Sequence, residues 1–409
     1  AVGLANHAVA NVLEFTVAEA GVGVQSYAGT LDLHNLGVHN ASVGLATASG
    51  ASSQVRTYVG TGLALAVDAG DADDFQLHGA SLEGERLVVG QGVSSMHMED
   101  VVFTSTSAME MRPAVDVRCE GVCALQSSVI EGQTHTGIVW SGTGTSQMEN
   151  VTVHATEQAV DAMGSGHSAW NNITVHAAHR GVSVQTPTSE LSSIIVHLTS
   201  NDGVGVDVLG GIHDWSNITV EKSFVSADQT SVGLKAWYSD LSLERFTSRN
   251  VSTGMMIEDS TVVARTVEAN IGSLAGVHLV DSTYRGMDLT TIAQDEGVLM
   301  EGETELHLSS WTAQLHDTPL MMSEGSFATV RSFMPLNTAP TSVDALGDGT
   351  LYYGSSINPA ISTSASYRLL ETDVTFTDLA GQPVEAHVVV HDFALMSNIN
   401  GALTLPLVS

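Results

Sequence analysis

Short apolar segments recur along the chain at a nearly constant spacing. Each segment begins with a small residue and continues with alternating branched or long apolar residues, as in Gly137–Trp140, Gly181–Val184 and Gly276–Leu279. Between Gly21 and Pro319 the segment returns with a mean period of about 23 residues. Alternation with a period of two, together with the many β-branched residues, predicts short strands and not helices.

A second phrase precedes the first by about nine residues in the middle repeats. It reads Asn150–Val153, Asn172–Val175, Ser193–Val196 and Asn217–Val220. Each repeat therefore contains two or three short strands, and a single coil cannot bury its own apolar residues. Stacking coils about 4.8 Å apart would pair the strands and build one continuous core. We expect an all-β chain with a parallel β-helix of about 14 coils over residues 1–334; a leucine-rich repeat has a similar period, but its signature is absent.

The period is lost after residue 334, which predicts a second domain over residues 335–409. The alternating segments Val374–Thr377 and Val384–Val390 flank the turn-forming residues Asp378–Pro383, and Asn400–Leu405 follows. These segments predict a β-hairpin within a small β-sandwich. The sandwich is either incomplete or completed by a strand from a partner.

The repeats resemble the right-handed parallel β-helix, or pectin-lyase-like, superfamily. The segment after residue 374 resembles carboxypeptidase-regulatory-like, transthyretin-like sandwich domains. The first resemblance implies activity on acidic polysaccharides, and the polygalacturonases of that group carry conserved catalytic motifs. Here Asp73-Asp74 stands alone, Gly166-His167-Ser168 is a poor match and no Arg-Ile-Lys sequence occurs. The resemblance therefore supports the fold more strongly than the activity.

Charge and composition limit the partners. The 409 residues contain 13 Lys+Arg and 45 Asp+Glu, for a formal charge of −32, and 43% are hydrophobic. This balance excludes a basic nucleic-acid footprint, and the hydrophobic content excludes an acidic disordered tail. No apolar run approaches the roughly 20 residues of a membrane span, and the chain opens without a basic leader segment. We expect a mature extracellular or cell-surface protein of a microbe from a saline environment.

Cysteines and glycosylation sequons point to the same compartment. Cys119 and Cys123 can form a disulfide only if the chain turns at Glu120-Gly121, and a metal site is the weaker alternative. Five Asn-x-Ser/Thr sequons are candidate glycosylation sites: Asn40, Asn150, Asn172, Asn217 and Asn250. Alternatively, the asparagines of the second phrase form an internal ladder.

The middle position of the first phrase faces outward and forms a column along the rod. Asp161 and Asp207 lie two coils apart, about 9.6 Å, near the upper limit for the carboxylates of inverting glycosidases. They are candidate catalytic residues, although acidic side chains are also common at exposed positions. Towards the C-terminus the same column becomes apolar at Met256, Leu299 and Met321. We expect the C-terminal domain or a neighbouring subunit to cover this interface.

Two further sets could bind metal ions. His154, His176 and His197 follow the second phrase on successive coils, where they could bind a transition metal, respond to pH or form an ordinary polar ladder. A calcium site is possible in the acidic segment 68–74, which lacks a recognisable calcium-loop pattern; its candidate ligands are Asp68, Asp71, Asp73 and Asp74. No cofactor is required by the sequence.

The sequence favours a structural or adhesive protein over an enzyme. We expect an exported β-helix that forms part of a surface layer, filament or appendage by self-association or by contact with a neighbouring surface protein. A glycan is a possible partner. The alternative is a polysaccharide-active lyase or glycoside hydrolase, or a carbohydrate-binding protein.

Overall fold

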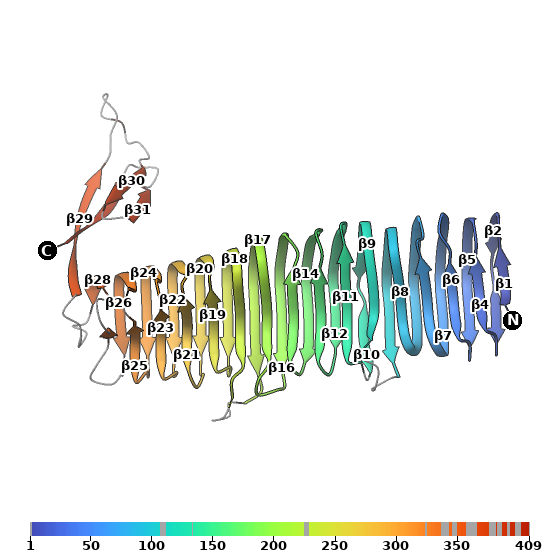
Figure 1. Ribbon diagram of the computed structural model, residues 1–409, viewed down its shortest axis with the longest axis horizontal. Helices are drawn as coiled ribbons and strands as arrows, with labels where there is room; N and C mark the ends of the chain where they lie inside the picture. Colours follow the sequence, from blue (N-terminus) through green and yellow to red (C-terminus); the bar gives the residue numbers. More distant parts are fainter. Residues whose placement is uncertain are drawn as a thin grey trace.

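The computed structural model describes residues 2–106, 112–132, 134–224, 229–323 and 325–336, several strands beyond them, and Gln382. The described chain forms a parallel β-helix of about 15 turns, with the N-terminus at one end of the rod (Figure 1). Each coil has three faces, which we call A, B and C in chain order. The phrase that begins with a small residue forms face A, and the second phrase predicted from sequence forms face C.

Face A consists mainly of short separate strands. These are β1 (Val2–Asn6), β4 (Val22–Ser26), β6 (Val43–Thr47), β11 (Thr136–Gly142), β13 (Gln158–Met163), β15 (Arg180–Gln185), β19 (Thr253–Glu258), β21 (Ala275–Val280), β23 (Glu296–Glu301), β25 (Thr318–Met322) and β27 (Val343–Ala345).

Faces B and C are usually formed by one strand that bends at a corner. The bent strands are β5 (Gly29–His39), β12 (Thr145–His154), β14 (His167–Ala177), β16 (Thr188–Leu198), β20 (Thr261–Asn270), β22 (Thr283–Ile292), β24 (Glu305–Gln314), β26 (Phe327–Leu336) and β28 (Thr350–Ser356). Shorter strands are β2 (Val9–Val12) on face B, and β3 (Phe15–Ala18) and β10 (Val129–Gly132) on face C. Longer strands that also include face A are β7 (Ala51–Gly70), β8 (Asp74–Ser105), β9 (Pro113–Gln126), β17 (Val204–Lys222) and β18 (Val232–Arg249).

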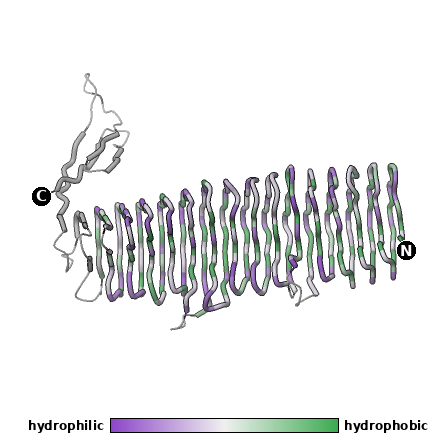
Figure 2. Tube along the Cα trace, in the orientation of Figure 1, coloured by the Kyte–Doolittle hydropathy of each residue, from purple (hydrophilic) through white to green (hydrophobic). Residues whose placement is uncertain are grey.

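The core is a set of apolar columns that run along the rod. Val160 pairs with Ile138 on the preceding coil and with Val182 on the next, and all three side chains are fully buried. Hydrophobic and hydrophilic residues alternate around each coil (Figure 2). The parallel ladder provides hydrogen-bond partners for the backbone N–H and C=O groups, and the stacked side chains exclude water. Each coil is therefore stabilised by its contacts with the neighbouring coils.

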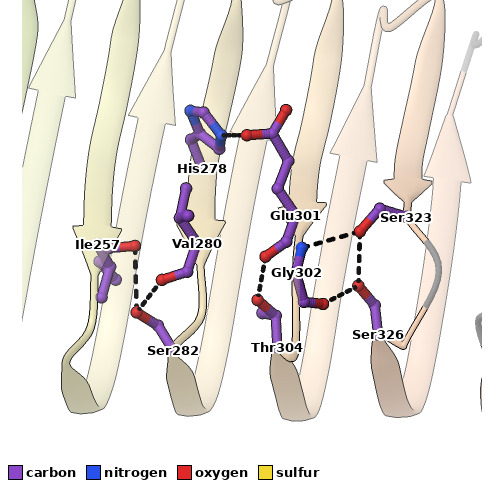
Figure 3. Close-up of polar contacts among 9 residues, drawn as sticks. All are labelled: Ile257, His278, Val280, Ser282, Glu301, Gly302, Thr304, Ser323 and Ser326. Atoms are coloured by element: carbon purple, nitrogen blue, oxygen red, sulfur yellow. Dashed lines mark hydrogen bonds and ion pairs between the residues drawn. The ribbon is translucent and has the colours of Figure 1, made fainter.

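The corner between faces B and C explains the recurring asparagines. Asn150, Asn172, Ser193 and Asn217 adopt positive φ angles of 55°, 56°, 56° and 54°. Asparagine tolerates this left-handed conformation better than most residues with a side chain. From Tyr238 onward, residues with positive φ lie at other corners of the coil, as Asp259 and Asp281 do after face A. There, hydroxyl groups donate to backbone carbonyls, as Ser282 does to Val280 at 2.6 Å (Figure 3).

Parallel pairing begins at β1, within the predicted range of residues 1–334. It continues beyond residue 334, where β27 pairs with β25 and β28 pairs with β26. The parallel pairing of the rod therefore crosses residue 334, and the division into two domains remains a prediction. The face A strand β27 has only three residues, Val343–Ala345, which is too short to show an alternating pattern.

The described C-terminal strands form two antiparallel pairs. β29 (Ser366–Thr375) pairs antiparallel with β32 (Ala402–Val408), and β30 (His387–Val390) pairs with β31 (Phe393–Met396). The predicted turn Asp378–Pro383 lies outside the described residues except for Gln382. A complete sandwich remains a prediction. In the described part of the chain, no helix is long and apolar enough to span a membrane.

Candidate functional site

A groove of about 540 Å³ runs along face B in the middle of the rod. We call it the face B groove. Its outward side chains lie in two neighbouring rows across successive coils. Below these rows lie Met148, Trp170 and Leu191, which are buried because strand alternation turns them inward. The outward lining residues are Gln126, Gln147, Glu149, Ala169, Asn171, Glu190, Ser192, Asp214, Ser216 and Glu244.

The groove offers carboxylates, amides and hydroxyls at regular spacing. Glu190 and Asp214 are exposed and directly adjacent in register. In the neighbouring row, the Ser192 hydroxyl donates to Oδ1 of Asn171 at 2.7 Å. None of the lining residues is Lys or Arg. The surface can therefore accept hydrogen bonds from hydroxyl or amino groups, and it would repel an anionic ligand.

The predicted carboxylate column lies on face A, away from the groove. Asp161 pairs in register with Ser183, which pairs with Asp207. Asp161 is only 7% exposed although its strand position faces outward, and its Oδ1 has no hydrogen-bond partner. Burial raises the pKa of Asp161, with partial compensation from a hydrogen bond to Ser183 and from Arg180. The carboxyl can therefore hold a proton above the usual pH range of an aspartate.

Asp207 completes this column. Nε of Arg180 lies 3.6 Å from Oδ2 of Asp207, and Lys235 follows Asp207 on the next coil. Burial raises the pKa of Asp207, while the positive charges of Arg180 and Lys235 oppose the shift. The structure thus brings the two predicted carboxylates into one column with basic neighbours. Whether they act on a substrate remains a prediction.

The three predicted histidines form a stack on the outside of face C. The ring centroids of His154 and His176 are 4.4 Å apart at an interplanar angle of 4°, and those of His176 and His197 are 4.6 Å apart at 15°. Imidazole nitrogens bind metals in the plane of the ring. The lone pairs of stacked, parallel rings therefore point in parallel planes and do not converge on one point. One metal ion at the usual distance of about 2.0–2.1 Å cannot reach all three in this arrangement. The stack ends at Glu221, whose Oε1 lies 2.9 Å from Nδ1 of His197.

We predict that this stack loses stability on acidification. Burial, followed by the neighbouring His154 and His197, lowers the pKa of His176. The native state therefore favours neutral His176. The resulting contribution to the free energy of unfolding is present at high pH and is lost as the pH falls through about 6.5, the pKa of an unperturbed histidine. His176→Asn should reduce the fall in unfolding free energy between about pH 7.5 and 5.5, measured by urea denaturation.

The matched control for that prediction is His167→Asn, because His167 lies on face B of the same coil. The control should retain the pH dependence of the wild-type chain. Equal pH dependence in the wild type and in His176→Asn would contradict a role for the stack.

The predicted calcium ligands do not converge. Asp68 accepts a hydrogen bond from its own turn at Gly70, and Asp74 accepts one from Gln76. Over residues 2–106, which contain all four candidates including Asp71 and Asp73, no three carboxylates lie within joint reach of one ion. The segment rounds a corner of the coil and directs these side chains to different surroundings. A different set, His78, His97 and Glu99, does converge.

The cysteines lie at a corner of the rod. Cys119 and Cys123 are joined in a disulfide, with their Cα atoms 6.0 Å apart. The pairing of β8 with β9 shifts register at this point, from Val93 opposite Cys119 to Ser95 opposite Val122. β9 therefore has one residue more than β8 over this stretch, and the extra residue provides the turn that the disulfide needs.

The asparagine ladder is at the surface, which corrects the expectation of an internal one. Asn150, Asn172 and Asn217 are exposed because left-handed corner residues direct their side chains outward, and Nδ2 of Asn172 donates to Oδ1 of Asn150 at 2.7 Å. Asn40 is exposed, whereas Nδ2 of Asn250 donates to the carbonyl of Lys222 at 2.8 Å. Glycosylation of these sequons remains a prediction.

The predicted apolar residues on face A lie in one column that also contains a histidine. Met256, Leu299 and Met321 are half-buried, and His278 lies between the first two in register. Nε2 of His278 lies 3.1 Å from Oε2 of Glu301 (Figure 3). Side chains beyond residue 336 lie outside the described part of the chain, with the exception of Gln382. The cover of this column therefore remains a prediction.

No profile of a known protein family, no curated protein and no solved structure matches this chain.

Proposed function

We propose that this chain is an exported structural and adhesive rod that contacts a glycan through the face B groove. The observation that supports this function best is the groove itself, which places polar side chains in two rows over successive coils. A surface of this kind suits a repeating ligand, because each coil places outward side chains at equivalent positions along the rod. A location outside the cell is supported by the disulfide.

The charge of the groove defines the class of glycan. Glu149, Glu190, Asp214 and Glu244 contribute four carboxylates and the lining contains no basic side chain. Polyuronates and sulfated glycans would be repelled, whereas sugar hydroxyls and amino groups can donate to the carboxylates. We therefore propose a neutral or amine-bearing glycan as the ligand.

The shape of the molecule supports a role in an assembly. Within this proposal the solenoid belongs to the right-handed, pectin-lyase-like class of β-helices, and neighbouring copies or a second surface protein meet at the Met256, Leu299 and Met321 column. A half-buried apolar row on an otherwise acidic rod would be shielded from water by such a contact.

Binding of defined oligosaccharides to the full chain tests the proposed ligand. Chitosan and neutral glucan oligosaccharides should bind, while polygalacturonate should not, in isothermal titration. Glu190→Gln/Asp214→Asn should weaken binding of the chitosan oligosaccharide about tenfold or more, since it loses two charged hydrogen-bond acceptors. Glu268→Gln/Asp288→Asn removes the same charge from outside the groove lining and should bind like the wild type.

Two outcomes would contradict this function. Equal weakening in both double variants would show that net charge, and not the groove, attracts the ligand. Release of shorter sugars that is lost in Asp161→Asn would instead support the alternative, a polysaccharide-active enzyme, because burial keeps this acid able to donate a proton.

A further inference from the structure

A cluster of two imidazoles and one carboxylate lies near the N-terminal third of the rod, on face B. Nδ1 of His78 lies 3.2 Å from Oε2 of Glu99, and Nε2 of His97 lies 3.7 Å from the same oxygen. One ligand atom from each of the three residues lies within 4.8 Å of the other two. We propose that His78, His97 and Glu99 bind a divalent transition-metal ion, with Zn²⁺ as the best match.

The distances fit a tetrahedral ion. Zinc holds nitrogen and oxygen ligands at about 2.0–2.2 Å, which separates neighbouring ligand atoms by about 3.3 Å. These two separations are close to this value and the third is within 4.8 Å, so side-chain rotations would bring all three atoms into coordination. Two histidines and one carboxylate are a donor set that binds zinc and other first-row divalent ions, whereas calcium prefers oxygen ligands alone.

The backbone holds the three ligands in place. His97 and Glu99 are two residues apart on β8 and therefore point to the same face, while His78 comes from the preceding coil of the same strand. Left-handed residues follow two of the ligands directly, with φ of 62° at Gly79 and 55° at Asp100. The bound ion would add a cross-link between two successive coils that β8 already joins.

The surroundings leave the ion accessible. The side chains of His78, His97 and Glu99 are 31%, 34% and 42% exposed, so a fourth position is open to water or to an added ligand. Ala124 pairs with His97 and adds little bulk. Arg56 pairs in register with His78 and carries the adjacent positive charge. Its guanidinium donates a hydrogen bond to Oε1 of Gln54 at 3.1 Å.

This site stands at one end of the face B groove. Glu99 pairs in register with Gln126, which is one of the groove-lining residues. The open coordination position therefore faces the same side of the rod as the proposed glycan contact. The metal site does not depend on that contact, and its test uses the metal alone.

Titration of the metal-free full chain with Zn²⁺ at pH 7.5 tests the site. We expect one tight 1:1 component by calorimetry, and visible bands of tetrahedral Co²⁺ when Co²⁺ replaces Zn²⁺. His97→Ala should weaken the tight component by at least about 100-fold, and Glu99→Gln by about tenfold, because each removes one ligand or its charge. His97→Gln repeats the test with a larger polar side chain, and circular dichroism verifies the fold of each variant.

His176→Ala is the matched control, because it removes a half-buried imidazole from the stack on face C. It should leave the tight component unchanged. The proposal is overturned if the wild type shows no 1:1 component, if His97→Ala and His97→Gln bind as tightly as the wild type, or if His176→Ala abolishes binding.

Discussion

Trp215→Ala is expected to lower the free energy of unfolding by about 3–5 kcal/mol. Trp215 is fully buried and lies in register between Leu191 and Leu243, so truncation leaves a cavity between two coils. Its indole Nε1 also donates to the hydroxyl of Ser189 at 2.8 Å, and that hydroxyl lies 2.8 Å from Nδ1 of His213. The substitution therefore removes both packing and one partner of a buried polar network.

Urea denaturation followed by circular dichroism measures this loss. Leu209→Ala is the control on the same strand, since Leu209 is 44% exposed and its truncation should change stability by less than about 0.5 kcal/mol. Similar midpoints for the two variants would contradict the view that inward columns carry the stability of the rod.

The main architecture could be predicted because each coil of a solenoid repeats the same pattern of buried and exposed positions. Gly181–Val184 and the equivalent phrases mark one strand per coil, and their period sets which residues stack. The same argument placed His154, His176 and His197 in one column, where their rings do stack. Columns are predictable because parallel pairing fixes neighbours at one coil spacing.

Features that depend on side-chain conformation could not be predicted in this way. Asp161 occupies an outward position, yet it is 7% exposed, and its carboxyl group interacts with the side chains of Ser183 and Arg180. His78 and Glu99 are separated by nearly one period, and this spacing was the signal that could have revealed their convergence. It was missed because His78 and Glu99 are different residue types and do not repeat as a visible phrase.

Pairing outside the repeat was the hardest feature to predict. The sequence predicts a local hairpin after Val374 whose turn lies outside the described residues, whereas the described strand β29 pairs with the distant β32. A turn-forming segment indicates where the chain can reverse, and it does not determine which strand becomes the partner. The period offers no help there, because it ends where these strands begin.

The small residue that opens each face A phrase is expected to be important for stability at Gly205. A Cβ atom there would lie 2.6 Å from the carbonyl oxygen of Gly233 and 2.3 Å from Cγ1 of Val220. The carbonyl belongs to the next coil, where Val204 and Val206 pair with Val232 and Leu234, so it cannot move away without disturbing the ladder. We predict that Gly205→Val destabilises the chain by about 1–3 kcal/mol or more.

Gly37→Val provides the control for this prediction. Gly37 is half-buried on β5, and the nearest atoms to an added Cβ belong to the side chain of Thr16, at 3.3 Å and beyond. Valine favours strands, so this change should be neutral or slightly stabilising. The comparison uses urea midpoints and the rate of cleavage by a protease. If Gly205→Val matched Gly37→Val in both, close approach of successive coils could not be the reason that face A begins with a small residue.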